Sequence, residues 1–352
     1  RWRFFGHRPG LRPPFKPQGA GSKGMAQKIH LGILGTGNMA HEFARGVSHA
    51  DNIELVAVAS RSRQAAERFA HEFGVPKYFP DYAALAADPG IDLVYISTPH
   101  SCHFENSLLC LEHGKGVICE KPFTINAREA NLLIEKARAK RLFLMEAMWS
   151  RYIPAIVRLR DLLAQNAIGR VQLMIAGGAF MPDFDPESYL FRPDLGGGVL
   201  LDAGVYLVSM ASMIFGSPGK ILAAGSLGSS GVDEHDAIVL QHENAALASL
   251  YVSLRGRASP DITLLGDRGK IHVHPPLFAP RALTLSMYGQ PDEVLQLPFE
   301  GNGYQFEAME AADCILRGQT ESAVMPLDET LSIMRTMDEI RRQLALKYPM
   351  EN

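Results

Sequence analysis

Short apolar runs rich in β-branched residues alternate with amphipathic segments through the first part of the chain. The runs predict strands, and apolar residues at three- and four-residue spacing predict helices. The predicted strands span residues 28–34, 53–59, 77–79, 91–97 and 117–119. The predicted helices span residues 38–47, 62–73, 81–87 and a segment from about 100 to 111. Strands that alternate with helices in this way favour a doubly wound parallel sheet.

The pattern changes near Trp149, after which strands follow one another with little helix between them. Amphipathic helices are predicted over residues 151–166, 304–316 and 327–346. Strands are predicted over residues 171–180, 220–227, 237–242, 246–254, 262–265, 270–274 and 283–287. Consecutive strands of this kind predict a large, open and mainly antiparallel sheet. The second part of the chain is therefore predicted to be an α+β domain.

Length and charge change this picture in two ways. A chain of 352 residues is too long for one ordinary core, so two domains are expected. Residues 1–24 carry six basic residues and no acid, and the remaining chain carries 29 basic and 38 acidic residues, a net charge of −9. An acidic body argues against a nucleic-acid partner.

Residues 1–24 are rich in Pro, Gly and Arg and have no apolar period. They are predicted to be a disordered leader or a remnant of an upstream or expression sequence, and they are excluded from the fold. No run of 18 apolar residues is found, which predicts no membrane span. The four cysteines have no Cys-x-x-Cys spacing, so reduced thiols and a cytoplasmic location are expected.

Directly after the first predicted strand comes the sequence Gly35-Thr36-Gly37-Asn38-Met39-Ala40. This is the Gly-x-Gly-x-x-Ala form of a dinucleotide fingerprint: the first glycine permits a tight turn and the second lets the backbone approach a pyrophosphate. The amides at the start of the following helix would bind the phosphates. The alternative is a structural glycine-rich turn. The fingerprint predicts a Rossmann domain over residues 25–148.

The second predicted strand ends in Ser60-Arg61-Ser62-Arg63, with no acidic residue. An NAD site commonly has an Asp or Glu here, for the ribose 2′-hydroxyl. A serine and a guanidinium suit a 2′-phosphate instead. The sequence therefore favours NADP, with NAD as the alternative, and predicts Arg61 as the main clamp with Ser60 beside it. Arg63 is either a second clamp or the solvated start of the next helix.

The fifth predicted strand ends in Glu120-Lys121-Pro122. Pro122 ends the strand, so Lys121 is delivered to the sheet edge where ligands of open α/β folds bind. The alternative is a solvated lysine. The two histidines His100 and His103 lie three residues apart, but no metal site is predicted for them. They lie beside the cofactor ribose, or one of them caps a helix.

Together, the fingerprint, the run Ser97-Thr98-Pro99 with its two histidines, and Glu120-Lys121-Pro122 resemble the glucose-fructose oxidoreductase/inositol dehydrogenase (Gfo/Idh/MocA) family of NAD(P)-dependent enzymes. Residues 144–151 and 196–206 are similar to its branch of dimeric dihydrodiol dehydrogenases, which also act as NADP-dependent D-xylose 1-dehydrogenases. The resemblance implies a substrate and dimerisation domain over residues 149–352, with the C-terminal helix packed back on the first domain. It also implies a homodimer formed through the C-terminal sheet.

The resemblance also implies roles for individual residues. Lys121 would contact the substrate hydroxyl and the cofactor, and Asp202 and Tyr206 would complete a catalytic set. Tyr206 stands where the inositol dehydrogenases have histidine, so inositol oxidation is disfavoured. Further implied cofactor contacts are Tyr95, Thr98, Pro99, His100, His103, Glu120 and Arg151. Implied substrate contacts besides Asp202 and Tyr206 are Trp149, Phe180 and Phe278. For Arg151 the alternative is an ion pair at the start of a helix.

The residue types of Lys121, Asp202 and Tyr206 indicate how this set could move a proton. A phenol, with a pKa near 10, is a poor base at neutral pH. The ammonium of Lys121 would favour the phenolate of Tyr206 and so lower its pKa. Asp202 and Tyr206 are four residues apart and would share a helix face, from which the carboxylate orients Lys121 or the substrate. The alternative is a buried tyrosine that is hydrogen-bonded to a core aspartate.

The sequence thus predicts an NADP-dependent oxidoreductase that transfers hydride between a secondary alcohol of a cyclic diol or sugar, of the trans-dihydrodiol or D-xylose type, and the nicotinamide. Its partner would be a small-molecule substrate, with no nucleic acid and no membrane. The alternatives are another sugar or keto-sugar reductase of the same fold, a non-catalytic NADP-sensing regulator, and a redox-neutral hydrolase that keeps its cofactor bound.

Overall fold

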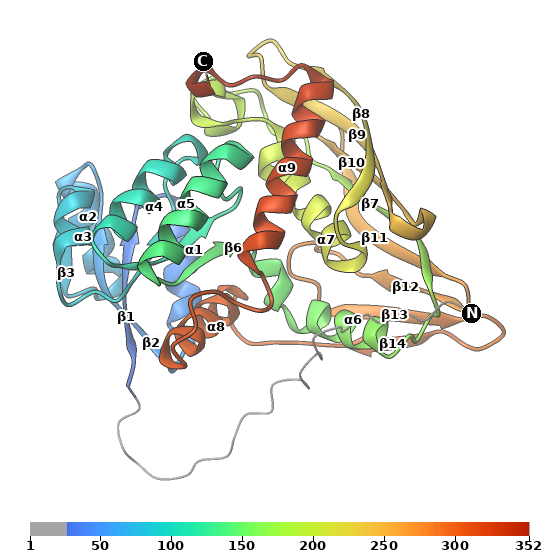
Figure 1. The fold of residues 1–352 in the computed structure, drawn as a ribbon, viewed down its shortest axis with the longest axis horizontal. Coiled ribbons are helices and arrows are strands. Elements are labelled where there is room, and N and C mark those ends of the chain that lie inside the picture. The colour runs from blue at the N-terminus through green and yellow to red at the C-terminus, as the bar shows by residue number, and fades with distance from the viewer. Residues whose placement is uncertain (1–26, 352) are drawn as a thin grey trace, which may run out of the picture.

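A computed structural model describes residues 27–351 of the chain, and Figure 1 shows two sheets with helices around and between them. The predicted leader, residues 1–24, lies outside the described residues. One sheet, with helices packed on it, forms the left part of the view, and the second sheet forms the right part. Helix α9 (Leu327–Leu344) runs between the two parts.

The first sheet has six parallel strands in the order β3-β2-β1-β4-β5-β6. The strands are β1 (Ile29–Leu34), β2 (Ile53–Ala59), β3 (Lys77–Phe79), β4 (Leu93–Ile96), β5 (Gly116–Glu120) and β6 (Leu144–Ala147). Every residue of β4, β5 and β6 is buried, because helices cover both faces of the sheet. The predicted doubly wound parallel sheet is therefore confirmed.

The helices of this part are α1 (Asn38–Val47), α2 (Arg63–Phe73), α3 (Tyr82–Ala87), the 3₁₀ turn η1 (His100–Cys102), α4 (His103–Glu112) and α5 (Ala127–Lys140). The sequence analysis did not predict α5 or β6. In β6 the buried Glu146 interrupts a short apolar run, so periodicity gave no strand signal there.

The second sheet has eight strands in the order β14-β13-β12-β11-β7-β10-β9-β8. The strands are β7 (Val171–Ala179), β8 (Pro218–Leu227), β9 (Asp233–His242), β10 (Leu247–Ser253), β11 (Ala258–Gly266), β12 (Gly269–Val273), β13 (Ala282–Met287) and β14 (Glu293–Gln296). The central pair β7 and β10 is parallel, and the other neighbours are antiparallel. The predicted mainly antiparallel sheet is confirmed, and β14 is an edge strand that was not predicted.

The remaining elements connect the two sheets and cover them. The longer helices are α6 (Pro154–Ala164), α7 (Val205–Phe215), α8 (Tyr304–Leu316) and α9. The short turns are η2 (Trp149–Tyr152), η3 (Tyr189–Phe191), η4 (Pro193–Leu195), the π-turn η5 (Leu200–Gly204), η6 (Glu243–Ala245) and η7 (Pro349–Glu351). Helix α8 packs on α1, and α9 packs on α5 and β6 as well as on α7 and β8. These helices therefore join the two sheets into one body.

One stretch, Pro193–Phe215, is long and apolar enough to cross a membrane, with a mean hydropathy of 1.8. The prediction that the chain contains no such stretch overlooked it. However, 78% of the apolar window is buried inside the protein. A core helix has the same properties, so this stretch is weak evidence for a membrane span.

Candidate active site

The fingerprint turn between β1 and α1 leaves an open cradle for an anion. Gly35 has a φ of +105°, and a Cβ there would lie 2.8 Å from the carbonyl oxygen of Ser97, so a side chain is excluded. At Gly37, by contrast, a Cβ would meet nothing within 4 Å. No side chain caps α1 and its first turn has no acid, so its amides can bind a phosphate. Asn38 is exposed and Met39 is half-buried at this helix start. The turn fits a dinucleotide.

The residues predicted to select the cofactor meet at the ends of β1 and β2. The hydroxyl of Thr36 donates to Ser60 Oγ at 3.2 Å, and Ser60 Oγ also accepts from the Ser62 amide at 3.3 Å. Arg61 is exposed beside Tyr82. Burial raises the pKa of Tyr82, and the positive charge of Arg61 opposes this effect. The guanidinium is thus placed at the carboxyl end of β2, where a 2′-phosphate would lie.

Strand β5 ends in Glu120, whose carboxylate is held by two neighbours. The amide of Lys121 donates to Glu120 Oε2 at 3.0 Å, and the hydroxyl of Tyr95 donates to Glu120 Oε1. Tyr95 is fully buried and stacks on Phe43 with 3.5 Å between ring centroids. The Tyr95 ring lies in the core and its hydroxyl positions Glu120, so the side chain has no exposed surface for the predicted cofactor contact.

Lys121, at 9% exposure, points to the π-turn η5. Its Nζ donates to the carbonyl oxygen of Asp202 at 2.7 Å and to Asp202 Oδ1 at 3.1 Å, and it lies 5.1 Å from the centroid of the Tyr206 ring. Burial alone would raise the pKa of Asp202, but the charge of Lys121 keeps it below its ordinary value. Since an ammonium has three N–H donors, one remains for a substrate oxygen.

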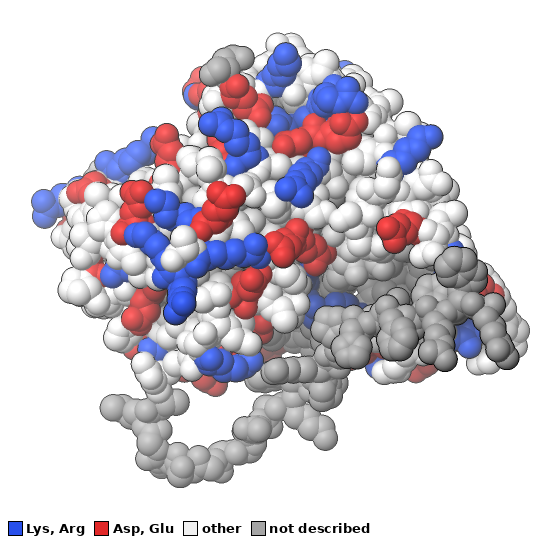
Figure 2. Space-filling model, in the orientation of Figure 1, with Lys and Arg blue, Asp and Glu red and all other residues white. Residues whose placement is uncertain are grey.

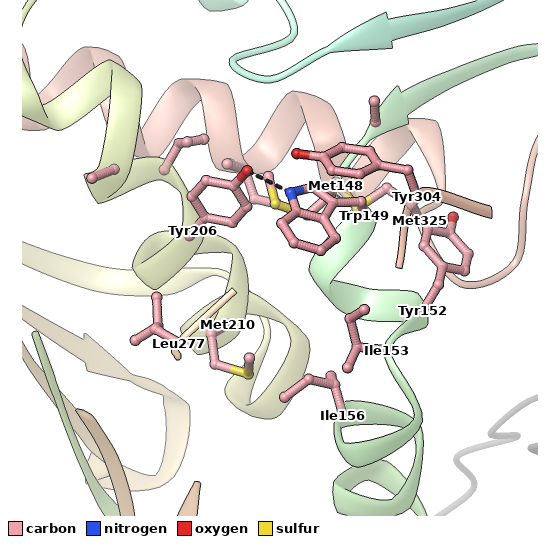
Figure 3. Packing of buried hydrophobic residues seen from close by; sticks show 14 of the residues in the cluster. Met148, Trp149, Tyr152, Ile153, Ile156, Tyr206, Met210, Leu277, Tyr304 and Met325 are labelled. Atoms are coloured by element: carbon pink, nitrogen blue, oxygen red, sulfur yellow. Dashed lines mark hydrogen bonds between the residues drawn. The ribbon is translucent and has the colours of Figure 1, made fainter. Parts of the chain in front are cut away.

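Tyr206, in the first turn of α7, is oriented by Trp149 (Figure 3). The indole Nε1–H of Trp149 donates to the Tyr206 hydroxyl oxygen at 2.8 Å, and Trp149 stacks on Tyr304 with 4.3 Å between centroids. Burial and the charge of Glu120 raise the pKa of Tyr206 well above its ordinary value. The predicted lowering of this pKa by Lys121 is therefore wrong, because desolvation outweighs the ammonium. Tyr206 is a hydrogen-bond donor at neutral pH, and Trp149 holds it in place.

The two histidines near the Ser97-Thr98-Pro99 run differ in their environments. The ring nitrogens of His103 face the carbonyl oxygens of Pro122 at 2.8 Å and Thr98 at 2.9 Å, and the side chain is fully buried. Burial lowers its pKa to about 4. His103 braces the backbone that follows Lys121, and its burial leaves no exposed side-chain surface for the predicted cofactor contact. Pro99 precedes η1 and is half-buried.

His100 lies closer to the catalytic set. Burial lowers its pKa to about 3, and the charges of His103, Lys121 and Asp202 also act on it. The ring is therefore neutral at physiological pH. Its Nδ1 lies 2.9 Å from the carbonyl oxygen of Gly196, so Nδ1 carries the proton and donates to this glycine turn.

Arg151 is 2% exposed, and its guanidinium is occupied by the protein. It donates to Ser209 Oγ at 3.0 Å, to the Ser209 carbonyl oxygen at 2.8 Å and to Glu329 Oε1 at 2.7 Å. A further bond of 3.2 Å reaches the carbonyl oxygen of Val324. The side chain ties η2 to α7 and α9, which favours the alternative of an ion pair over the predicted cofactor contact of Arg151.

Beside Tyr206 lies an apolar cavity of about 160 Å³. The aromatic rings of Phe278 and Tyr206 are 4.3 Å apart. None of the side chains that line the cavity can form a hydrogen bond; they are Gly177, Gly178, Ala179, Phe180, Ala203, Leu207, Val252, Pro260, Leu277 and Phe278. Phe180 and Phe278 thus both line the cavity, whereas Trp149 packs against Tyr206 in the core.

Tyr189 was not predicted, although the structure places it in this cluster. It lies in η3, is 47% exposed, and its hydroxyl donates to Asp202 Oδ1 at 3.2 Å. The sequence carried no signal for it, because a tyrosine in an irregular segment has no characteristic spacing. The segment before Asp202 is fixed by Asp233, whose Oδ2 accepts from the Leu200 amide at 2.6 Å.

A metal centre is not indicated within residues 27–351, where no group of three or more His, Cys, Asp or Glu residues is arranged to hold an ion. The chemistry available to the cluster is therefore that of Lys121, Asp202, Tyr206 and Tyr189 beside a dinucleotide cradle.

Comparison with known proteins agrees with this geometry. Residues 29–148 match the oxidoreductase family model described as an NAD-binding Rossmann fold, and residues 156–272 match the GFO/IDH/MocA C-terminal domain. A trans-1,2-dihydrobenzene-1,2-diol dehydrogenase of Mus musculus is 35% identical over 335 residues, which cover 92% of this chain and 99% of the relative. A D-xylose 1-dehydrogenase (NADP(+)) of Hypocrea jecorina is 33% identical over 373 residues, covering 93% and 95%.

A solved 3-ketoreductase from Actinomadura kijaniata, in complex with NADP, has the same fold, with a TM-score of 0.82, 24% identity, and coverage of 90% of this chain and 98% of that one. The two family matches and the full-length relatives confirm the predicted resemblance. The chain belongs to the Gfo/Idh/MocA family and is an oxidoreductase with a nicotinamide-dinucleotide-binding Rossmann domain.

Proposed function

We propose that this oxidoreductase transfers hydride between the carbon of a secondary alcohol in a cyclic diol and NADP. The observation that carries the proposal is the convergence of Lys121, Asp202 and Tyr206 at the carboxyl end of β5. Donors that meet at one point can bind the oxygen of an alcohol or a carbonyl and stabilise the charge that develops on it. This site lies at the edge of the sheet that carries the dinucleotide cradle.

Each residue of the set has a distinct part in the chemistry. Bound NADP supplies the hydride acceptor, or NADPH the donor. The ammonium of Lys121 donates its remaining N–H to the substrate oxygen, and Asp202 holds the ammonium in place. When a carbonyl is reduced, Tyr206 donates its proton to the same oxygen, and the phenolate that remains regains a proton from solvent. When an alcohol is oxidised, Tyr206 must first lose its proton to solvent, and the phenolate then accepts the proton of the alcohol. Trp149 orients the Tyr206 hydroxyl for this transfer.

We base the preference for NADP on Ser60 and Arg61 at the end of β2, where no acidic residue is present to bind a ribose hydroxyl. Replacing Arg61 with alanine should weaken NADP binding by roughly 10- to 100-fold, since a charge-assisted hydrogen bond is worth about 1.5–3 kcal/mol. Binding of NAD should change little. Dissociation constants of both cofactors, measured by titration calorimetry, test this. Arg68→Ala, at an exposed position farther along α2, is the matched control, and an equal loss for both cofactors would contradict the role of Arg61.

The substrate class is proposed from the apolar cavity beside Tyr206. A sugar ring presents hydroxyls on most of its carbons, and each needs a hydrogen-bond partner when it is buried. The cavity side chains offer none, so they suit the hydrocarbon part of a cyclic diol. The dihydrobenzenediol dehydrogenase relative is named for such a substrate, and the D-xylose 1-dehydrogenase for a sugar. A sugar or keto-sugar reductase remains the second candidate, which the relative from Hypocrea jecorina supports.

The test is nicotinamide absorbance at 340 nm for the purified protein with a trans-dihydrodiol, D-xylose, D-glucose and inositol. Turnover of the diol with NADP, at a higher kcat/KM than for the sugars, supports the proposal. The opposite ranking favours the sugar oxidoreductase. Tight NADP binding without turnover in either direction favours a sensing regulator, and turnover without net absorbance change favours the redox-neutral hydrolase.

We further propose a homodimer formed through the outer face of the second sheet. Large apolar side chains are exposed across its strands β7 to β10: Ile175 at 45%, Leu222 at 53%, Val239 at 37%, Leu247 at 38% and Tyr251 at 41%. Strand register places Leu222 next to Val239, and Ser249 next to both Val239 and Ile175. A contiguous apolar face of this kind favours a protein partner, and an isologous dimer is the commonest assembly.

Ile175→Asp should convert the dimer to a monomer, because the new carboxylate would be buried without a partner at the interface. Sedimentation velocity measures the change. Leu132→Asp, at a 42% exposed position of α5 away from this face, is the control and should leave the assembly intact. A wild-type protein that sediments as a monomer at micromolar concentration would refute the dimer.

Nucleic acid and membranes are not proposed as partners. On the face shown in Figure 2, basic and acidic side chains are interspersed over the helices of the first domain. Such mixing gives no extended positive field for a nucleic acid. All four cysteines are free thiols, which favours the reducing cytoplasm, and cell fractionation tests this location.

A further inference from the structure

The segment that joins β7 to η5 contacts the candidate site at two points. At its start, Phe180 lines the apolar cavity together with Phe278 and Ala203. Near its middle, in η3, Tyr189 donates its hydroxyl proton to Asp202 Oδ1, the oxygen that also accepts from Lys121. The same segment therefore contacts both the apolar cavity and the polar cluster of the candidate site.

Tyr189 has the exposure expected of a group that meets a ligand. Its side chain is 47% exposed, although its hydroxyl is bonded to the partly buried Asp202. Its ring lies 5.9 Å from that of His100, nearly perpendicular to it. The proton of the phenol is committed to Asp202, so the oxygen lone pairs are what it can offer to a neighbour. A lone pair of this kind accepts a hydrogen bond from a second hydroxyl.

A vicinal diol has a second hydroxyl on the carbon next to the reacting one. The first hydroxyl would bind Lys121 and Tyr206. The nearby polar groups are then Asp202, which is hydrogen-bonded to Lys121, and Tyr189, which is hydrogen-bonded to Asp202. The cavity side chains on the other side are apolar and cannot bind a hydroxyl. The second hydroxyl is therefore expected on the polar side of the described cluster, where the acceptors are Asp202, Tyr189 and, next to the Tyr189 ring, His100 Nε2.

We propose that Tyr189 is a specificity-determining residue that accepts a hydrogen bond from the hydroxyl adjacent to the reacting carbon, so that the site selects vicinal diols over simple alcohols. The inference rests on the proposed diol oxidoreductase function. Phe180 and Phe278 receive the ring, and Tyr189 with Asp202 receives the second hydroxyl.

The test compares trans-cyclohexane-1,2-diol with cyclohexanol, which lacks the second hydroxyl. In Tyr189→Phe, kcat/KM for the diol should fall roughly 3- to 10-fold, as expected for one neutral hydrogen bond, and the loss for cyclohexanol should be much smaller. Calorimetric dissociation constants of both alcohols for the NADPH-loaded protein, in which no hydride acceptor is present, give the same comparison without turnover. Tyr78→Phe is the matched control, because Tyr78 is 37% exposed and its hydroxyl donates to a carboxylate, Glu67 Oε1, at 3.3 Å.

The outcomes separate this inference from the function on which it rests. A selective loss for the diol supports the role of Tyr189. Equal losses for both alcohols would mean that Tyr189 acts only by positioning Asp202, and no loss for either would mean that it does not contact the substrate; both results overturn the inference. Wild-type protein that binds NADP but neither binds nor turns over any alcohol would instead overturn the proposed function.

Discussion

Lys121→Met is expected to lower kcat/KM by about three to four orders of magnitude while NADP still binds. The substitution keeps the length of the side chain but removes the charge and the N–H donors that stabilise the substrate oxygen. Positioned acid–base groups contribute about 10²- to 10⁴-fold, and one lost donor to a developing oxyanion costs about 10²- to 10³-fold. Initial rates at 340 nm and the dissociation constant of NADP measure the two effects separately. Tyr206→Phe should cost less, about 10²- to 10³-fold, because Lys121 remains.

A folding control is necessary because methionine leaves the Asp202 carboxylate with Tyr189 as its remaining side-chain partner. Circular dichroism and the melting temperature establish whether the variant is folded. Lys136→Met, at an exposed position of α5, is the matched control and should retain wild-type rates. If folded Lys121→Met keeps more than about a tenth of the activity, Lys121 is an ordinary cleft lysine and the proposed proton chemistry is wrong.

Arg151→Met is expected to lower the free energy of unfolding by about 3–5 kcal/mol, the range for removing one partner of a buried ion pair. The guanidinium is 2% exposed and bonds Ser209, Val324 and Glu329, so its loss removes the arginine donor from four acceptor atoms. Arg151→Lys should not restore stability, because an ammonium cannot reproduce the planar fork. Urea denaturation followed by circular dichroism measures the change.

The same variant tests whether Arg151 contacts the cofactor. Its affinity for NADP, measured under conditions where the protein is folded, should equal that of the wild type. Arg342→Met provides the comparison: this side chain is 71% exposed and paired with Glu339, so its removal should lower stability far less than the removal of Arg151. A stable Arg151→Met protein with weakened NADP binding would reinstate the cofactor contact.

Predictions that depended on local pattern were the successful ones. The parallel strands were predictable because burial on both faces requires continuous apolar runs, as in β4 and β5. The fingerprint turn was predictable because Gly35 has a backbone geometry and a contact with Ser97 that exclude a side chain. Strand β6 was missed because the buried Glu146 breaks its short apolar run. Helix α5 was also missed, because its pattern of apolar residues was not recognised.

Predictions that depended on side-chain direction were less successful. Tyr95, His103 and Arg151 stand close in sequence to motif residues, yet each points into the core. Tyr95 and His103 brace Glu120 and the backbone after Lys121, and Arg151 joins three elements. A motif defines where the backbone goes, but one residue's shift along a strand or turn reverses the direction of a side chain.

By itself the sequence determined the two-part fold, the family, the dinucleotide cradle and the delivery of Lys121 to the sheet edge, because these follow from periodicity and from short motifs with fixed backbone geometry. The family resemblance grouped Asp202 and Tyr206 with Lys121, but only the tertiary structure decided the contacts among these side chains and added Tyr189 to them. Asp202, Tyr206, Trp149 and Tyr189 come from three separate segments, and the raised pKa of Tyr206 arises first from burial and then from Glu120. Desolvation and contacts between distant segments exist only once the chain has folded, so no local pattern could have contained them.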